Sequence, residues 1–196
     1  IVLTIDNLVL EIERVSPAKQ KGDKKLYTYN DSIEELRKRG YERHLKPCEA
    51  FRVIIDAIEN QNSQYKQTSD DMCSSYGEWL SLAIKRTQNR LTLYIDPKNL
   101  AEVEDNLSSQ TRSFQIGEKV PSKKWVDLNK FPSELIEFLY SRPFDQLPDV
   151  MKEGDKKAQL WLPQDGAIMP VSRDGLYGFN IYGKYYNRAS RGVRLK

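Results

Sequence analysis

The sequence contains few residues with the types and spacing of a catalytic centre. His44 is the only histidine, and most nucleophilic triads and zinc sites depend on imidazole groups. Cys48 lies four residues away, but the intervening Pro47 argues against one continuous helical face, so we do not expect a Cys–His dyad. His44 is therefore expected to be a partly exposed side chain between the cations Arg43 and Lys46.

Two segments match phosphate- or metal-handling motifs only in part. Residues 178–184 have the glycine and lysine spacing of a phosphate-binding loop, but Tyr185 replaces the Ser or Thr hydroxyl that would hold Mg²⁺. Asp155 and Lys157 have the acid-x-Lys spacing of metal-dependent nucleases, in which carboxylates hold the metal ion and lysine polarises the phosphate. Because HExxH, GxSxG and GxGxxG are absent, we expect a binding protein rather than an enzyme, with no cofactor and no metal ion.

Positive charge and aromatic residues are concentrated at the carboxyl end. Residues 183–196 carry five basic side chains and no acid, so residues 1–182 sum to −2 within a net charge of +3. Arginine and lysine bind phosphates, and tyrosine rings stack on exposed bases. We therefore predict nucleic-acid contact through a strand and tail between Gly175 and Lys196. The predicted contact residues are Tyr182, Lys184, Tyr185, Tyr186, Arg188, Arg191 and Arg194. Residues 188–196 contain little to anchor them, so the tail could become ordered only when bound.

These features predict a non-catalytic recognition module of a larger assembly, with single-stranded or structured nucleic acid as its partner. Two alternatives stay open. In the first, the same strand and tail dock onto a protein partner with an acidic surface, and the chain is an interaction or structural subunit. In the second, the chain is a metal-dependent nuclease that uses Asp155 and Lys157.

Composition and cysteine usage indicate the class and compartment of the protein. The longest apolar run is far shorter than the ~20 residues that a membrane-spanning helix needs, and the amino end has no secretory leader pattern. We therefore expect a soluble, cytoplasmic protein with no membrane partner. Cys48 and Cys73 are expected as two unbridged thiols, with a single disulfide between them as the alternative. The chain begins at Ile1 rather than Met, which leaves N-terminal processing open.

Apolar spacing and capping residues predict about four helices. Phe51, Ile54, Ile55 and Ile58 fall at i, i+3, i+4 and i+7 after a proline, which suits the first turn of a helix. The expected helices cover residues 33–40 behind a Ser32–Glu35 capping box, the segment after Pro47, the segment after Asp96, and the segment from Ser133 to the residues before Pro143. Residues 16–25 and 60–75 are expected to be loops.

Alternating apolar residues predict strands joined by tight turns. One or two strands are expected in residues 1–15, a hairpin in residues 80–85 and 91–95, a short strand at 114–116, and a three-stranded meander in residues 160–162, 168–171 and 176–186. A helix over residues 79–84 is the alternative to the first hairpin strand. Tight turns require antiparallel pairing, so the predicted class is α+β with mainly antiparallel strands. Residues 1–196 are expected to form one domain, with a soft boundary near residues 108–113. Trp79, Trp125 and Trp161 are expected in the core, and an exposed one would mark an interface.

Overall fold

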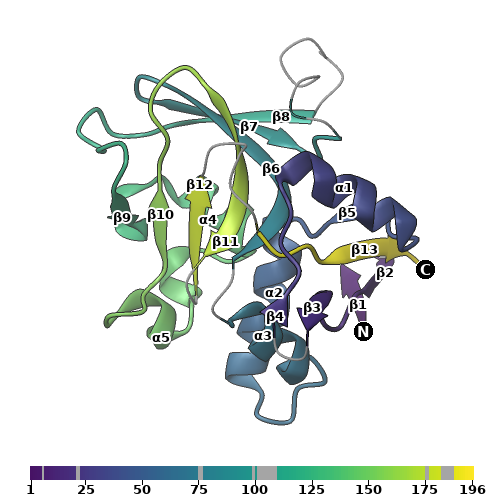
Figure 1. Ribbon diagram of the computed structural model, residues 1–196. Helices are drawn as coiled ribbons and strands as arrows, with labels where there is room; N and C mark the ends of the chain where they lie inside the picture. The colour runs from purple at the N-terminus through teal and green to yellow at the C-terminus, as the bar shows by residue number, and fades with distance from the viewer. Residues whose placement is uncertain are drawn as a thin grey trace.

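Figure 1 shows the computed structural model of the chain, in which helices and strands are interspersed. The structure describes residues 1–5, 7–20, 23–74, 77–98, 100, 110–174, 177–181 and 188–196. The fold is α+β, as predicted, with two mostly antiparallel sheets, one of which curls into a half-barrel. No helix in these ranges is long and apolar enough to cross a membrane.

Five α-helices and two short 3-10 helices lie in the described ranges. They are α1 (Tyr29–Lys38), α2 (Pro47–Glu59), α3 (Lys66–Met72), α4 (Ser133–Tyr140), α5 (Asp149–Lys152), η1 (Leu128–Lys130) and η2 (Phe144–Gln146). The predictions for α2 and α4 are confirmed. Pro47 occupies the first turn of α2, and the carboxylate of Glu49 accepts a hydrogen bond from the backbone N–H of Lys46 at 2.8 Å. These contacts satisfy backbone groups that the helix itself leaves unpaired.

The larger sheet has seven strands in the order β8–β7–β6–β11–β12–β10–β9. The strands are β6 (Glu78–Thr87), β7 (Arg90–Ile95), β8 (Gln110–Gln115), β9 (Trp125–Asp127), β10 (Gln159–Trp161), β11 (Ile168–Asp174) and β12 (Gly178–Ile181). β6 and β7 form the predicted hairpin, since Leu82 pairs with Ile95 and Thr87 with Arg90. The helical alternative for residues 79–84 is therefore wrong.

The smaller sheet has four strands in the order β1–β2–β13–β5, and a separate pair joins β3 to β4. The strands are β1 (Val2–Ile5), β2 (Leu8–Ile12), β3 (Ala18–Gln20), β4 (Asp23–Lys24), β5 (Arg43–His44) and β13 (Gly192–Leu195). The predicted strands within residues 1–15 are thus confirmed as β1 and β2. Residues 16–25, expected to be a loop, contain the short β3–β4 pair.

One apolar cluster connects the two sheets to α2 and α4. The ring of Phe51 on α2 lies 4.4 Å from that of Tyr140 on α4 and 4.9 Å from that of Phe179 on β12, measured between centroids. Leu3 of β1 and Val193 of β13 belong to the same buried cluster. Burial of each such side chain contributes about 1.5–3 kcal/mol. The first and last strands are therefore anchored to the core that carries the larger sheet.

The three strands at 159–181 are neighbours, but they are not the predicted meander. β11 and β12 form the expected antiparallel hairpin, whereas β10 pairs in parallel with β12. β11 already pairs with β6 on one edge and with β12 on the other, so neither of its edges is left for β10. The prediction of a simple meander is therefore wrong in strand order.

The last residues are an internal strand rather than a tail awaiting a partner. β13 pairs with β2 on one side and β5 on the other, and the backbone N–H of Lys196 donates to the carbonyl of Val9 at 3.0 Å. Val193 is buried. Backbone pairing on both edges anchors this segment, although residues 188–196 carry three arginines and a lysine. The expectation that the tail orders only when bound is wrong for residues 188–196 (Figure 1).

Two predicted boundaries near the amino end are also wrong. α1 begins at Tyr29 because Thr28 is its N-cap, with the hydroxyl accepting from the N–H of Asp31 at 3.3 Å. Ser32 lies inside the helix, where its hydroxyl donates to the carbonyl of Tyr29 at 2.5 Å.

The expected loop at residues 60–75 contains α3, which buries Met72. Most of the helix expected after Asp96 lies outside the described residues, as do 101–109 as a whole.

Candidate nucleic-acid interface

Arg191 is fully buried, so its guanidinium does not face solvent. Its Nη2 donates to Glu78 Oε1 at 2.9 Å and its Nε to Glu78 Oε2 at 3.1 Å, and a further bond joins Nη2 to Asp71. The guanidinium also donates to the backbone carbonyl of Glu13. Burying an arginine with two carboxylates is tolerable only when the charges are hydrogen-bonded in this way. Arg191, directly before β13, thus connects this end of the chain to α3 and β6.

The other two predicted arginines also have acidic partners within the chain. Arg188 Nη2 lies 3.6 Å from Asp174 Oδ2. Arg194 Nη2 lies 3.0 Å from Glu11 Oε2, its guanidinium carbon lies 5.5 Å from the centre of the Tyr41 ring, and its side chain is 42% exposed. The structure does not bring these three arginines to one surface, because Arg191 is internal and Arg194 is on the four-stranded sheet. The remaining predicted residues, Tyr182, Lys184, Tyr185 and Tyr186, lie outside the described residues.

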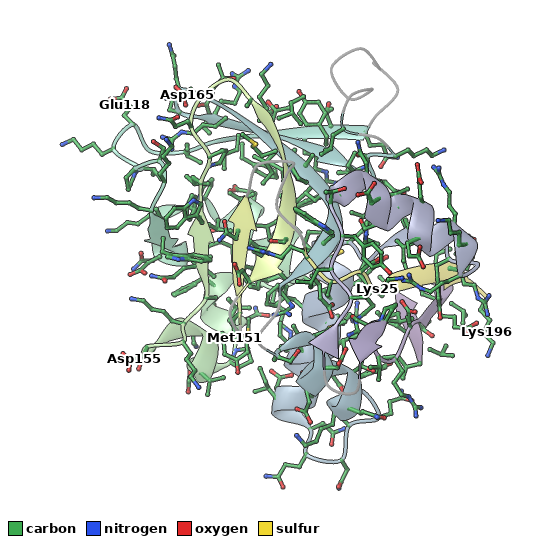
Figure 2. All side chains as sticks on the ribbon, viewed as in Figure 1. Lys25, Glu118, Met151, Asp155, Asp165 and Lys196 are labelled. Carbon is green, nitrogen blue, oxygen red and sulfur yellow. The ribbon has the colours of Figure 1, made fainter. Side chains whose placement is uncertain are left out.

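The two catalytic candidates do not lie in a cluster of acids. Asp155 is exposed at the far end of the loop after α5, as Figure 2 shows. Lys157 Nζ donates to Asp127 Oδ2 at 2.9 Å. In the part of the chain that the structure describes, no group of three or more His, Cys, Asp or Glu side chains lies close enough to hold a metal ion.

Trp125 on β9 is an exposed aromatic side chain. Trp125 is 39% exposed, whereas Trp79 is buried as predicted. Trp125 pairs in register with Trp161 of β10, and the two rings meet edge to face with centroids 5.7 Å apart. Strand alternation explains this placement, because Val126 and Leu160 point to the opposite face and are buried. The expectation that Trp125 lies in the core is wrong, and an exposed tryptophan marks a candidate interface.

Four exposed lysines surround Trp125 along the chain, and no acid of the described residues forms an ion pair with any of them. Lys119 and Lys130 line a hollow of about 510 Å³ beside the Trp125 ring, together with Val120 and Pro121. We call Lys119, Lys123, Lys124, Trp125, Lys130 and Trp161 the tryptophan–lysine surface. Its side chains come from β9, β10, η1 and the loop that precedes β9.

Asp127 is the single acid within residues 119–130, and its carboxylate already has hydrogen-bond partners in the chain. Asp127 accepts hydrogen bonds from Lys157 and from Gln159, the latter at 2.6 Å, and these bonds hold its pKa below the usual value. Its negative charge is therefore offset mainly by Lys157, with a smaller electrostatic contribution from Lys130. Glu118, at the top of the same side of the molecule in Figure 2, is the nearest exposed acid along the chain.

Arg188, one of the predicted contact residues, is connected to the tryptophan–lysine surface through Asp174 and Gly178. Gly178 of β12 lies against the Trp125 ring, so that a Cβ added there would be 3.1 Å from the ring carbon Cζ3. Gly178 pairs in register with Asp174, and Asp174 is the ion-pair partner of Arg188. Partners in register share one face of a sheet. Arg188 and Trp125 therefore lie along the same face, on either side of the Asp174–Gly178 pair.

A signal for this surface was present in the sequence. Residues 119–130 contain four lysines, one aspartate and one tryptophan. The stretch carries less net charge than the carboxyl end, which is why the charge count favoured residues 183–196. No family model, no curated protein and no solved structure matches this chain.

Proposed function

We propose that this protein binds single-stranded nucleic acid at the tryptophan–lysine surface, as a recognition module without its own chemistry. The observation that carries the proposal is an exposed Trp125 ring among four exposed lysines that form no ion pair with a described acid. Stacking on an aromatic ring suits any base, and lysines neutralise the phosphates on either side. The same combination underlies sequence-tolerant binding of single strands.

The shape of the surface supports single strands more than duplex. The Trp125 ring is packed against Gly178 and Trp161, which fixes its orientation before a ligand arrives. The hollow beside it, about 510 Å³, is lined by Lys119 and Lys130 and is large enough for a small organic group. A base removed from a duplex stack can enter such a hollow, whereas a paired base cannot.

Some of the predicted carboxyl-terminal contact residues remain part of the proposed interface, and others do not. Arg188 lies on the same sheet face as Trp125, so a bound strand that crosses Gly178 would approach it. Lys184, Tyr182, Tyr185 and Tyr186 follow β12 in the sequence and remain predicted contacts. Arg191 is excluded from the proposed interface because it is buried.

A charge-matched pair of variants tests the proposal. The test variant carries Lys123→Gln, Lys124→Gln and Lys130→Gln, and the control carries Lys38→Gln, Lys66→Gln and Lys152→Gln. Fluorescence anisotropy of a labelled single-stranded oligonucleotide is measured at several salt concentrations. The test variant is expected to bind more weakly and to lose about 2 from the slope of log K against log salt, since each contact to a single strand contributes roughly 0.7.

The control variant loses the same net charge, but its lysines are near Glu35, Asp70 and Asp149. It is expected to keep the wild-type slope. Equal losses in both variants would mean that only net charge matters and would contradict the proposed surface. Absence of binding to wild-type protein at low salt would favour the alternative of an acidic protein partner. Cleavage of the oligonucleotide with Mg²⁺ that Asp155→Asn abolishes would favour the nuclease alternative.

The proposed location is the cytoplasm. Cys48 and Cys73 are half-buried thiols that form no disulfide, so the alternative of a disulfide between them is wrong. Unbridged cysteines are typical of reducing compartments.

A further inference from the structure

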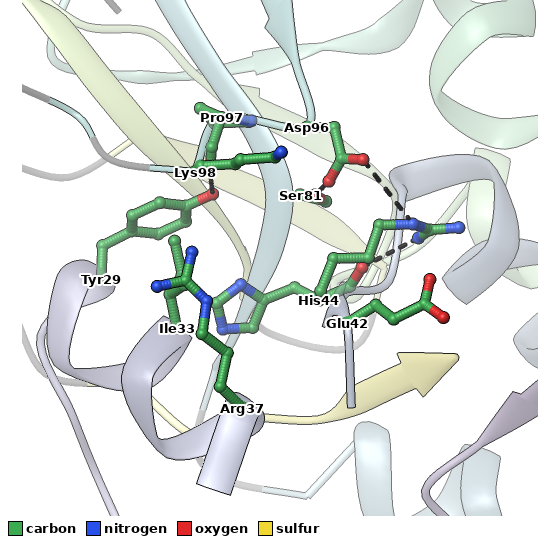
Figure 3. Close-up of a pocket in the computed structure, with 10 residues that line it drawn as sticks. Tyr29, Ile33, Arg37, Glu42, His44, Ser81, Asp96, Pro97 and Lys98 are labelled. Atoms are coloured by element: carbon green, nitrogen blue, oxygen red, sulfur yellow. Dashed lines mark hydrogen bonds and ion pairs between the residues drawn. The ribbon is translucent and has the colours of Figure 1, made fainter. Parts of the chain in front are cut away.

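A second hollow, remote in the sequence from the tryptophan–lysine surface, lies between α1 and the ends of β5, β6 and β7. Its volume is about 410 Å³, which is within the range of small-molecule sites. Figure 3 shows its lining residues, among them Tyr29, Arg37, His44, Asp96 and Lys98. They come from segments far apart in the sequence, so only the folded chain creates this cavity.

One wall of the cavity is a single face of α1. Tyr29, Ile33 and Arg37 follow one another at intervals of four residues, which places them in a row along the helix. The hydroxyl of Tyr29 donates to the carbonyl of Pro97 at 3.1 Å, and this bond ties the helix to the opposite wall. Tyr29 is fully buried. The two walls are thus held at a fixed separation before any ligand binds.

Arg43 is one of the three cations that line the cavity, and its guanidinium interacts with two acids of the chain. It donates two hydrogen bonds of 2.7 Å to Glu49, and its Nε lies 3.9 Å from Asp96 Oδ2. Asp96 in turn accepts a hydrogen bond from the Ser81 hydroxyl at 2.5 Å. Asp96 thus shares Arg43 with Glu49, and its exposed carboxylate can still accept a hydrogen bond from a ligand hydroxyl.

The other two cations are available to a ligand. The side chains of Arg37 and Lys98 are exposed and form no ion pair or hydrogen bond with any described residue. Figure 3 shows Arg37 on the α1 wall and Lys98 on the opposite wall, where its amino group extends toward the Asp96 side of the cavity, whereas the carboxylate of Glu42 points away from both. Three cations and two acids line the cavity, so its lining carries a net positive charge, which favours an anionic ligand.

His44 supplies a hydrogen-bond acceptor at the same place. It is buried rather than partly exposed as the sequence suggested, and burial lowers its pKa to about 3, with a smaller contribution from nearby Arg39. The Ser32 hydroxyl gives its hydrogen to the carbonyl of Tyr29, so Ser32 accepts from His44 Nε2–H at 2.9 Å. In this neutral tautomer Nδ1 carries no hydrogen and can accept one from a ligand.

We propose that this cavity binds a small phosphate monoester with a hydroxylated body, such as a sugar phosphate. Arg37 and Lys98 hold the phosphate, whose two negative charges match theirs. Asp96 and His44 Nδ1 accept hydrogen bonds from hydroxyl groups on the body. The site is separate from the tryptophan–lysine surface and does not depend on nucleic-acid binding.

Isothermal titration calorimetry with ribose 5-phosphate tests this site, with ribose and inorganic phosphate as comparison ligands. Ribose 5-phosphate is expected to bind more tightly than inorganic phosphate, and ribose is expected to give no saturable heat. The variant Arg37→Gln/Lys98→Gln should weaken binding roughly ten- to hundredfold for each charge-assisted hydrogen bond that is lost. Both residues are exposed, so the variant is expected to fold.

The control variant is Lys38→Gln/Lys66→Gln, which removes the same net charge elsewhere and should leave ribose 5-phosphate binding unchanged. Binding that survives in Arg37→Gln/Lys98→Gln would overturn the phosphate assignment. Equal affinity for inorganic phosphate and ribose 5-phosphate would overturn the roles of Asp96 and His44. Absence of any saturable heat at millimolar ligand would overturn the site. The variant Lys123→Gln/Lys124→Gln/Lys130→Gln is expected to bind ribose 5-phosphate normally, whatever the outcome of the oligonucleotide experiment.

Discussion

Replacing Arg191 with methionine distinguishes a structural arginine from a nucleic-acid contact. The substitution keeps the apolar length of the side chain but removes the charge that faces Glu78 and Asp71. Glu78 is only 3% exposed, so water cannot solvate the carboxylate that is left behind. Breaking a buried ion pair by removing one partner costs about 3–5 kcal/mol. That loss is a large part of the ~5–15 kcal/mol that stabilises an ordinary domain.

The loss is measured by urea unfolding and by the melting temperature. For a chain of this size a loss of 3–5 kcal/mol lowers Tm by roughly 6–20 °C. Arg194→Met is the matched control, because Arg194 also pairs with a carboxylate, that of Glu11, but is 42% exposed. Exposed pairs contribute about 0–1 kcal/mol, so the control should melt close to wild type. A double variant, Arg191→Met with Glu78→Gln, should recover part of the stability because it removes the uncompensated charge.

Binding measurements complete the test. Below its melting temperature, Arg191→Met should bind the oligonucleotide with wild-type affinity and salt slope, since no phosphate can reach a buried guanidinium. If Arg191→Met proved as mild as Arg194→Met in stability, or lost one phosphate contact from its salt slope, the assignment of Arg191 as structural would be refuted.

Three further outcomes are expected. The pKa of His44 is about 3 in the folded protein and about 6.5 in the unfolded chain, so the unfolded state takes up the proton first, and stability should fall by about 1.4 kcal/mol per pH unit below pH 6.5. Urea titrations should show this loss to be smaller in His44→Gln, and an identical pH dependence would refute it. Gly192→Ala should destabilise the four-stranded sheet, because its Cβ would lie 2.2 Å from Tyr41 Cγ; an unchanged urea midpoint would count against this packing. Cys48 and Cys73 should react slowly with iodoacetamide at pH 7.5, because burial raises the pKa of both thiols; rates equal to those of the unfolded chain would show them to be accessible.

Local sequence patterns predicted the elements whose signals are strong at short range. The apolar stripe after Pro47 predicted α2, and the alternation on both sides of the turn at 87–89 predicted the β6–β7 hairpin. Such patterns record which side chains face the core, and the core then forms as the pattern requires. The α+β class followed from the same reasoning.

Long-range pairing could not be predicted in this way. β13 is recognisable only once its partners β2 and β5 are known, because it is four residues long and lies in a segment, 188–196, with three arginines and a lysine. For the same reason the burial of Arg191 could not be predicted, since the carboxylates that permit it come from residues 71 and 78. Charge density at the carboxyl end therefore suggested a free basic surface where the folded chain pairs its arginines internally.

The tryptophan–lysine surface was only half visible in the sequence. The lysines of residues 119–130 can be counted, but the exposure of Trp125 depends on which face of β9 points outward. That face is set by the pairing of β9 with β10, whose partner residues are separated by more than thirty positions. A short strand whose apolar residues face the core and whose aromatic residues face outward is the sequence pattern that indicates such a surface.

The most direct test of the central claim is the intrinsic tryptophan fluorescence of the protein during titration with an unlabelled single-stranded oligonucleotide. Trp79 is buried and Trp161 is half-buried, so quenching should come mainly from Trp125, whose exposed ring is proposed to stack on a base. Trp125→Phe should still bind by anisotropy but lose most of the quenching. Binding accompanied by the same quenching in Trp125→Phe, or binding without quenching in wild type, would contradict the account.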